Sequence, residues 1–488
     1  MLEARRVITG RTYSERRENY VSLHKSAIMV DLQAHPSLAS TWFGYDLTLP
    51  HDRPGLVQRL LHIDPLGLDP LSVRTSFPKL VAGDVDVQVS TIYALERDTI
   101  RKDLGVKVRL FGVTLPWTFT LYTVLSWLRW LPYLNTMWRS AVRVEDYYTG
   151  ALIALDNMER QIARHMEQDP STPGFRRIEV AHSPAELRAL LARHSLAIVH
   201  ALEGAHCLEG PETRRIQQRE PDPHTRSPEG QAIVRREVLA NLEAFYSRGV
   251  AIMGLCHYYP NEVSESVFSY PEPVLERIPY ERWLQTWPDH TRGLTDLGKE
   301  VVDWMLTHGM IIDVSHVSPT SRMEIYNMVD TLHHGKKGAV LASHIGVQAM
   351  YNHPYNLADW EIEWFADHDC VVGVMLSSYW LAARDDLRLA LGLITDTIDH
   401  LVRVGGEKVV AFGSDFDGFS NPPDEIQDAS RWMELTRHLF AQYAVRRFTD
   451  SAGALLRREI VRKYSDDTIR AFLGGNALNT ILQGWGRP

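Results

Sequence analysis

The stretch AIMVDLQAHP, residues 27–36, ends a short apolar run with three polar residues spaced two apart: Asp31, Gln33 and His35. In a β-strand this spacing turns all three side chains to one face. An acid, an amide and an imidazole on a common face indicate a place that holds a metal ion or a polar ligand.

Other predicted strands also end in residues that bind metals or move protons: Glu203, His257, His316, His344 and Asp415. Each of them alone has a simpler explanation, such as a hydrogen-bonded loop histidine, a helix cap or a turn-forming acid. The combination favours a functional site, because the carboxyl ends of the strands in a parallel barrel gather at one rim.

Imidazole and carboxylate ligands without thiolate suit one or two ions of zinc or another divalent first-row metal. Metal-bound water loses a proton near neutral pH and becomes a nucleophile. Asp415 would carry a proton to a leaving amine, and His257, if it is not a ligand, would stabilise the oxyanion of a tetrahedral intermediate. These residue types together predict hydrolysis of an amide or ester.

Eight short apolar runs alternate with helix patterns along the chain. The runs are 27–31, 85–93, 196–202, 250–256, 310–314, 338–343, 371–376 and 408–413. Buried strands alternating with helices imply a parallel sheet, and eight of them favour a closed (β/α)8 barrel of the TIM type. An open doubly wound sheet is the alternative, but no glycine-rich phosphate fingerprint follows any run.

The composition is that of an ordinary globular chain. Its 488 residues are 44% hydrophobic and 23% charged, and a net charge of −9 with scattered basic residues argues against nucleic acid as a partner. Three distant cysteines show neither a disulfide framework nor a cysteine zinc site, and the polar N-terminus lacks a signal-peptide core. We therefore expect a cytoplasmic protein that acts on a small molecule.

One apolar segment departs from this pattern. Residues 110–128 carry no charge, over a length near that of a membrane span. Pro116 and the dispersed aromatic residues favour a hydrophobic lid over a spanning helix. Contact of residues 104–138 with a membrane surface or a partner is the remaining alternative. We expect one barrel over 1–488, with an apolar, aromatic-rich insertion at 98–142 after the second strand.

Several motifs resemble the membrane (renal) dipeptidase family of the amidohydrolase superfamily. They are ALEGAH, GLTDLGKEVVDWMLTHGMIIDVSHVS, LASH, AFGSDFDGF and LGGNALNTIL, and the resemblance covers roughly residues 25–97 and 140–485. It implies a (β/α)8 barrel with two zinc ions that cleaves dipeptides and, in some members, related amides. It also implies a homodimer, since members of the family often pair.

The resemblance assigns roles position by position. Glu203 matches the glutamate that bridges both metals, and His316 and His344 match the two histidines on the second metal. His257 matches the histidine that binds the substrate and polarises the scissile carbonyl. Asp415 matches the catalytic aspartate.

The first strand departs from the family pattern Asp-Gly-His-x-Asp, whose histidine and second aspartate hold the first metal. Here Gln33 stands in place of that histidine and His35 in place of that aspartate. A neutral amide binds zinc more weakly than imidazole, and loss of a carboxylate removes compensating charge. Two alternatives stay open: a weak first site that includes His35 and Glu203, or a single ion on Glu203, His316 and His344.

The expected substrate site also departs from the family pattern. Where the family has an arginine for the free carboxylate of the dipeptide, this chain has Tyr355, and a phenol cannot form that bidentate charged pair. Together with an apolar insertion that would roof the pocket, this favours a hydrophobic or modified dipeptide. The alternatives are an N-acyl amino acid, lactone or other amide or ester hydrolase, a non-hydrolytic descendant that keeps one metal, and a membrane-associated or scaffolding protein.

Overall fold

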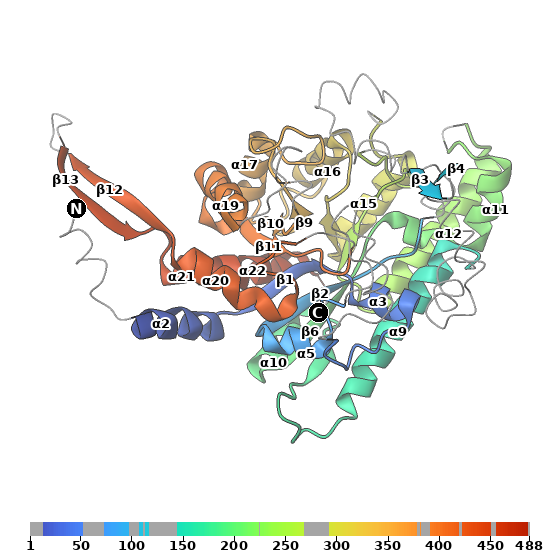
Figure 1. Cartoon of the computed structure of the whole chain (residues 1–488). Helices are drawn as coiled ribbons and strands as arrows, with labels where there is room; N and C mark the ends of the chain where they lie inside the picture. Colours follow the sequence, from blue (N-terminus) through green and yellow to red (C-terminus); the bar gives the residue numbers. More distant parts are fainter. Residues whose placement is uncertain are drawn as a thin grey trace.

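The computed structural model describes residues 13–51, 73–96, 107–110, 113–116, 144–223, 225–267, 292–377, 381, 391–418, 422–449 and 455–486. Its centre is a nearly closed barrel of eight parallel strands with helices packed around it (Figure 1). Around the barrel the strands are β1 (Met29–Ala34), β2 (Val85–Ile92), β6 (Leu196–Leu202), β7 (Ile252–Gly254), β8 (Ile311–Asp313), β9 (Val340–Ile345), β10 (Val371–Met375) and β11 (Val410–Gly413). The predicted (β/α)8 barrel is confirmed, and each predicted strand overlaps one of these eight.

The first and last strands of the barrel, β1 and β11, meet at their carboxyl ends. Ala34 and Phe416 form a parallel bridge, and the backbone N–H of His35 donates to the carbonyl of Phe416 at 2.8 Å. The N–H of Asp415 donates to the carbonyl of Gln33 at 2.9 Å. Residues with predicted chemical roles therefore lie directly beside the seam of the barrel.

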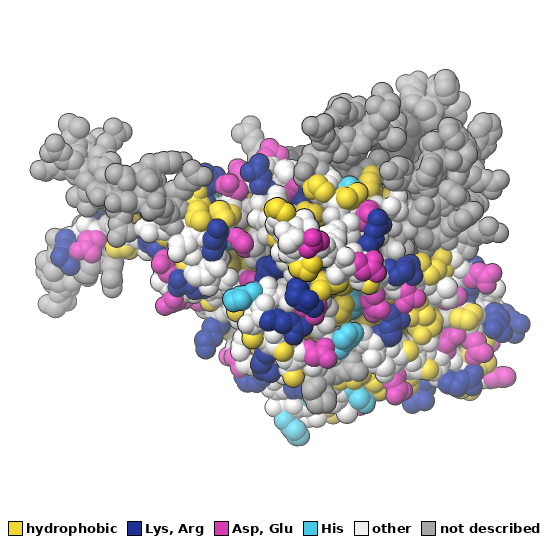
Figure 2. Space-filling view, turned by 90° about the horizontal axis from the view of Figure 1, so that it is seen from below, with side chains coloured by type: hydrophobic (Ala, Val, Ile, Leu, Met, Phe, Trp, Pro, Cys, Tyr) yellow, Lys and Arg dark blue, Asp and Glu magenta, His cyan; other side chains and the backbone are white. Residues whose placement is uncertain are grey.

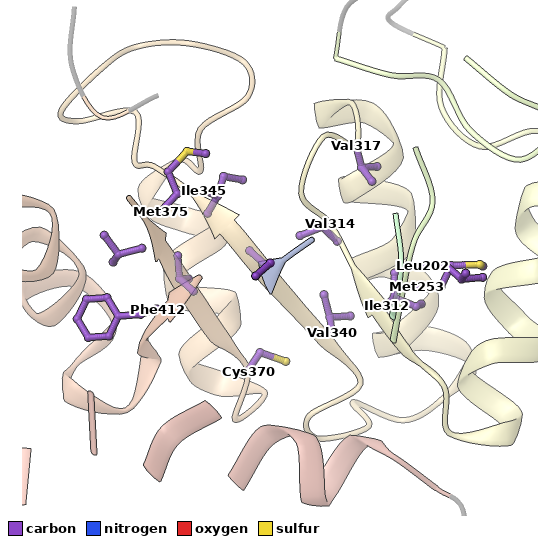
Figure 3. Packing of buried hydrophobic residues seen from close by; sticks show 14 of the residues in the cluster. Leu202, Met253, Ile312, Val314, Val317, Val340, Ile345, Cys370, Met375 and Phe412 are labelled. Atoms are coloured by element: carbon purple, nitrogen blue, oxygen red, sulfur yellow. The ribbon is translucent and has the colours of Figure 1, made fainter. Parts of the chain in front are cut away.

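Side chains along the strands alternate between two apolar layers, as the period of a strand requires. In β6, Leu196, Ile198 and Leu202 face the layer between strands and helices, whereas Ala197, Val199 and Ala201 belong to the inner layer. Figure 3 shows part of the outer layer, with labelled side chains from several strands lying between the sheet and the helices. Both layers are closed to solvent.

Several covering helices begin with a capping side chain. Ser183, Thr295 and Ser318 each accept a backbone N–H three residues further on, at the starts of α10 (Pro184–Ala192), α15 (Asp296–His308) and α16 (Pro319–Leu332). Gly309 ends α15 with a φ of 72°, a left-handed conformation that favours glycine. The other helices around the barrel are α3 (Pro36–Phe43), α5 (Phe77–Ala82), α9 (Tyr147–Met166), α11 (Pro211–Arg219), α12 (Pro228–Ser247), α17 (Asp359–Asp367), α19 (Leu391–Gly405) and α20 (Trp432–Phe440).

The amino ends of the strands are covered by the last helix of the chain. Helix α21 (Asp466–Arg470) leads through a wide turn at Ala471–Gly475 into α22 (Asn476–Gly484). Ala477 and Ile481 of α22, together with Trp485, pack into the inner apolar layer. The N–H of Gly486 donates to the carbonyl of Gly309, just before β8, at 2.8 Å. The site residues and α22 therefore lie at opposite ends of the barrel.

Three features outside the barrel were not predicted. Strand β5 (Ile178–Val180) pairs with β6, and β3 (Lys107–Leu110) pairs antiparallel with β4 (Val113–Pro116) inside the predicted insertion at 98–142. The remainder of that insertion, with its predicted lid, lies outside the described residues. Strands β12 (Tyr443–Thr449) and β13 (Leu455–Arg462) form a hairpin that projects from the body on the side of α2 (Tyr13–Ser26) (Figure 1).

The described surface gives two further observations. Within the ranges given above, no helix is both long and apolar enough to cross a membrane. Figure 2 shows a face of the molecule on which basic and acidic side chains are interspersed. A mixed charge pattern of this kind gives that face no extended field of one sign.

Candidate metal centre

Glu203, His316 and His344 converge at the carboxyl ends of β6, β8 and β9. The Nε2 atoms of His316 and His344 lie 2.9 Å apart, and Oε1 of Glu203 lies 3.4 and 3.7 Å from them. All three side chains are buried, and their ligand atoms lie within 4.8 Å of one another. Two imidazoles and one carboxylate at this spacing fit a divalent metal ion with three protein ligands and one open position.

The electrostatic surroundings keep the two imidazoles neutral, which is the form that binds metal. Burial, aided by the nearby His316, lowers the pKa of His344 well below its usual value. Burial likewise lowers the pKa of His316, although Glu203 opposes this effect. Neither histidine therefore needs to lose a proton near neutral pH before it can act as a ligand.

Two residues that the sequence analysis missed orient His344. Its Nδ1 lies 2.7 Å from Oγ of Ser343, which donates its own proton to Asp313. Nδ1 therefore carries the proton, and Nε2 keeps its lone pair for a metal. The only signals in the sequence are an acid at the end of IID and a serine just before the histidine of LASH.

Several site residues adopt a backbone conformation that local sequence does not predict. His316, Asp415 and Asp417 have φ values of 65°, 55° and 62°, in the left-handed region that residues other than glycine seldom occupy. Such conformations cost of the order of 1–3 kcal/mol each and gather at functional sites. His316 and Asp415 follow β8 and β11 and lie at the site, whereas the carboxylate of Asp417 accepts hydrogen bonds from the backbone N–H groups of Arg74 and Thr75.

His257, at the end of β7, is held by Glu96, another residue missed in the sequence. Nδ1 of His257 lies 2.7 Å from Glu96 Oε2, and the hydroxyl of Tyr93 and the N–H of Tyr259 both donate to the same carboxylate at 3.1 Å. Burial alone would raise the pKa of Glu96, but His257, His206 and the N–H of Tyr259 together outweigh it and lower that pKa. The ring of His257 lies 4.6 Å, centre to centre, from that of His316, so its free edge lies beside the metal centre.

Asp415 lies at the end of β11, with Oδ1 3.6 Å from Nε2 of His35. Burial and the carboxylate of Glu203 raise the pKa of Asp415 well above its usual range, although His35 acts in the opposite direction. A carboxyl group with a raised pKa is suited to take up and release a proton near neutral pH. Gly418, of the motif GSDFDG, lies so close that any Cβ at this position would collide with Asp415 and His35.

Gln33 and His35 reach the other side of Glu203. Nε2 of His35 lies 3.0 Å from Glu203 Oε2, and Nε2 of Gln33 lies 3.2 Å from Glu203 Oε1. Burial alone would lower the pKa of His35, but Glu203 and Asp415 outweigh it and raise that pKa.

Asp31 has different partners from Gln33 and His35. Its carboxylate accepts from N and Oγ of Ser414 at 2.9 and 2.7 Å. The pairing of β1 with β2 shifts register between Asp31 and Ala34. Asp31 therefore ties β1 to the end of β11, whereas Gln33 and His35 reach Glu203.

Tyr355 is completely buried beside the metal centre. Its hydroxyl donates to the carbonyl of His344 at 2.9 Å. Behind the same loop, Arg322 donates to both carboxylate oxygens of Glu361, at 2.7 and 3.1 Å, and to the carbonyl of Pro354 at 3.1 Å. Arg322 is thus engaged in holding the loop that carries Tyr355.

Comparisons with known proteins point to one family. A model of the family described as membrane dipeptidase (peptidase family M19) matches residues 226–450. A protein of Klebsiella pneumoniae described only as an uncharacterised protein in the pqqA 5′ region is 33% identical over 204 residues, which are 41% of this chain and 67% of that protein. Dipeptidase aclJ of Aspergillus oryzae (strain ATCC 42149 / RIB 40) is 27% identical over 198 residues, 41% of each chain. The chain thus spans about two fifths of the fungal relative.

Solved structures share the fold over nearly the whole chain. One, described as a metallo peptidase, dipeptidase AC, has a TM-score of 0.59 and 17% identity, with 95% of this chain and 100% of that chain covered. A metallo peptidase from Rhodobacter sphaeroides, liganded with a phosphinate mimic of the dipeptide L-Ala-D-Ala, has a TM-score of 0.60 and 16% identity, with 94% and 100% covered. Identities this low show a common fold.

Proposed function

The chain belongs to the membrane dipeptidase family, as its motifs indicated, and on this premise we propose that it is a metal-dependent hydrolase that cleaves an amide bond of the dipeptide type. The observation that carries the proposal is the convergence of Glu203, His316 and His344 into one buried group. His257 and Asp415 lie beside that group. Metal ligation, carbonyl polarisation and proton transfer are therefore available at one rim.

Each residue has a role in the proposed reaction. Glu203, His316 and His344 hold a divalent metal ion, and zinc is the ion that two imidazoles and a carboxylate suit best. Such an ion, when bound, acidifies water and polarises a carbonyl group. Asp415 takes up a proton from the attacking water and delivers it to the leaving amine. His257, held at Nδ1 by Glu96, directs Nε2 to the oxygen of the scissile carbonyl.

The proposed substrate is a hydrophobic or modified dipeptide. A free carboxylate is bound best by the bidentate fork of an arginine, but Tyr355 stands at the matching position and Arg322 is paired with Glu361. Tyr355 is fully buried and its hydroxyl donates to the carbonyl of His344, so we propose that this position supplies no clamp for a free carboxylate. The same observation supports the second class of substrates, N-acyl amino acids, lactones and other amides or esters.

Four further expectations rest on the sequence alone. They are a homodimer, a single barrel domain over 1–488, contact of 104–138 with a membrane surface, and a cytoplasmic location.

Replacement of Asp415 by asparagine tests the mechanism. Asp415→Asn keeps the size of the side chain but removes proton transfer, so kcat should fall at least about 100-fold while metal content stays unchanged. The measurement is hydrolysis of a panel of apolar dipeptides, with metal analysis of the same preparation. Asp424→Asn, at an exposed position, is the matched control. Full activity in Asp415→Asn would contradict the mechanism.

A further inference from the structure

Two nitrogen atoms from the end of β1 lie against the two carboxylate oxygens of Glu203. Nε2 of His35 lies 3.0 Å from Glu203 Oε2, and Nε2 of Gln33 lies 3.2 Å from Glu203 Oε1. The two nitrogens lie 3.0 Å apart. Two N–H groups side by side on the two oxygens of one carboxylate reproduce the fork that a guanidinium forms.

The carboxylate of Glu203 fixes the orientation of the Gln33 amide, because an ionised carboxylate can only accept the hydrogen bond that joins Gln33 Nε2 to Glu203 Oε1 at 3.2 Å. The NH2 group therefore faces Glu203, and the amide oxygen faces β2, where it accepts from the hydroxyl of Thr91 at 2.7 Å. The oxygen is the atom of this side chain that binds a metal, whereas the NH2 group only donates hydrogen bonds. Gln33 therefore presents a donor to Glu203 where a metal would require an acceptor.

The two ring nitrogens of His35 also indicate a hydrogen-bond donor to Glu203 rather than a metal ligand. Metal-binding histidines almost always donate their second N–H to an acceptor, as His344 does to Ser343. Nδ1 of His35 is buried and has no hydrogen-bond partner among the described residues. The proton therefore belongs on Nε2, where Glu203 accepts it, and Nε2 has no lone pair left for a metal.

We propose that the active site of this chain holds a single metal ion, on Glu203, His316 and His344, and that the N–H groups of Gln33 and His35 take the place of a second ion. The inference rests on the proposed function and deepens it, since it fixes the number of ions. The two donors neutralise and orient the carboxylate of Glu203: His35 binds Oε2, and Gln33 binds Oε1, the oxygen that also lies near His316 and His344. Within the described residues, Glu203, His316 and His344 form the one group of three or more His, Cys, Asp or Glu side chains whose ligand atoms all lie within 4.8 Å of one another.

The number of metal ions per chain tests this inference directly. Wild-type protein is saturated with zinc, freed of excess metal by gel filtration and analysed by mass spectrometry for zinc against protein concentration. We expect one zinc per chain. Two zinc per chain would overturn the inference and leave the proposed function intact, whereas no retained zinc would overturn the proposed function itself.

Two sets of variants sharpen the result. The double variant Gln33→His with His35→Asp supplies an imidazole and a carboxylate to the same side of Glu203, and it should raise the content from one zinc to two. His35→Ala should still bind one zinc, whereas His344→Ala should lose it. Loss of zinc in His35→Ala would show that His35 is a ligand and would overturn the inference. If the double variant fails to fold, as seen by thermal unfolding, the wild type and the two alanine variants decide the question.

Discussion

The carboxylate of Glu96 lies outside every recognisable motif, yet it accepts hydrogen bonds from His257, Tyr93 and the backbone of Tyr259. Three donors on one buried carboxylate leave the ring of His257 a single orientation. At the metal centre, Ser343 and Asp313 likewise fix the orientation of the ring of His344. The residues that touch the reacting groups thus depend on a second set of polar residues for their geometry.

Glu96→Gln tests this dependence. The variant keeps the shape of the side chain but removes the charge that holds the proton on Nδ1 of His257, so kcat should fall about 10- to 100-fold. Metal content and KM should stay close to the wild-type values, because Glu96 is a positioning residue that acts through His257. Steady-state kinetics and metal analysis measure both effects, with Glu363→Gln at an exposed position as the control. A rise in KM at unchanged kcat would assign Glu96 to substrate binding instead.

At the scale of elements, most of the barrel strands could be predicted because they are buried apolar runs that end in a polar residue, whereas β2 shows the alternation of apolar and polar residues that is typical of a strand. The helix starts at Ser183, Thr295 and Ser318 could be predicted because a capping side chain acts within one turn. The hairpin β12–β13 was missed, because its arginine-rich strands lack the apolar face that marks a packed strand. The register shift in β1 was missed as well, because contacts with β2 and β11 determine it.

Strand β6 carries a buried histidine that makes the fold sensitive to acid. His200 lies opposite Ser90 of β2, and neither of its ring nitrogens has a hydrogen-bond partner among the described residues. Burial lowers the pKa of His200 to about 3. Between pH 6.5 and 3 the unfolded chain therefore binds a proton that the folded chain excludes, and the free energy of unfolding falls as the pH falls.

His200→Leu should remove this acid sensitivity. The contribution of His200 is about 1.4 kcal/mol of unfolding free energy per pH unit below 6.5. From pH 7.5 to 5.0 the wild type should therefore lose about 2 kcal/mol more stability than His200→Leu. Urea unfolding of both proteins at the two pH values measures the difference. Equal losses in the two proteins would contradict the burial of a neutral His200.

At the scale of the whole molecule, chemistry and stability lie at opposite ends of the barrel. The polar site lies at the carboxyl ends of the strands, and α22 with Trp485 covers the amino ends. This is the usual division in barrels of this type. Substitutions at the covered end should therefore change stability without changing the chemistry.

Trp485→Ala tests that separation. Trp485 is 2% exposed and packs into the inner apolar layer, so its removal should lower the free energy of unfolding by about 3–5 kcal/mol. At temperatures where the variant stays folded, kcat should match the wild type within about twofold. Urea unfolding and steady-state kinetics measure the two quantities. A large loss of kcat in folded protein would show that the two ends are coupled.

Much of the site was also visible in the sequence, because chemically distinctive residues follow the strands that carry them. Glu203, His316 and His344 meet as expected from their positions at strand ends. Glu96, Asp313 and Thr91 were not found, since each acts through a contact with a residue on another strand or loop, and the role of Ser343 depends on its hydrogen bond to Asp313 of β8. The left-handed conformations of His316 and Asp415 could not be predicted either. The surrounding structure imposes these conformations, and local sequence does not favour them.

The most direct test of the central claim is hydrolysis of an apolar dipeptide by wild type and Glu203→Ala, each measured after chelation and after zinc is returned. The account predicts that chelated wild type is inactive, that zinc restores its activity, and that Glu203→Ala neither retains zinc nor recovers activity. Hydrolysis by chelated wild type, or by Glu203→Ala at the wild-type rate, would contradict a hydrolase built on Glu203, His316 and His344.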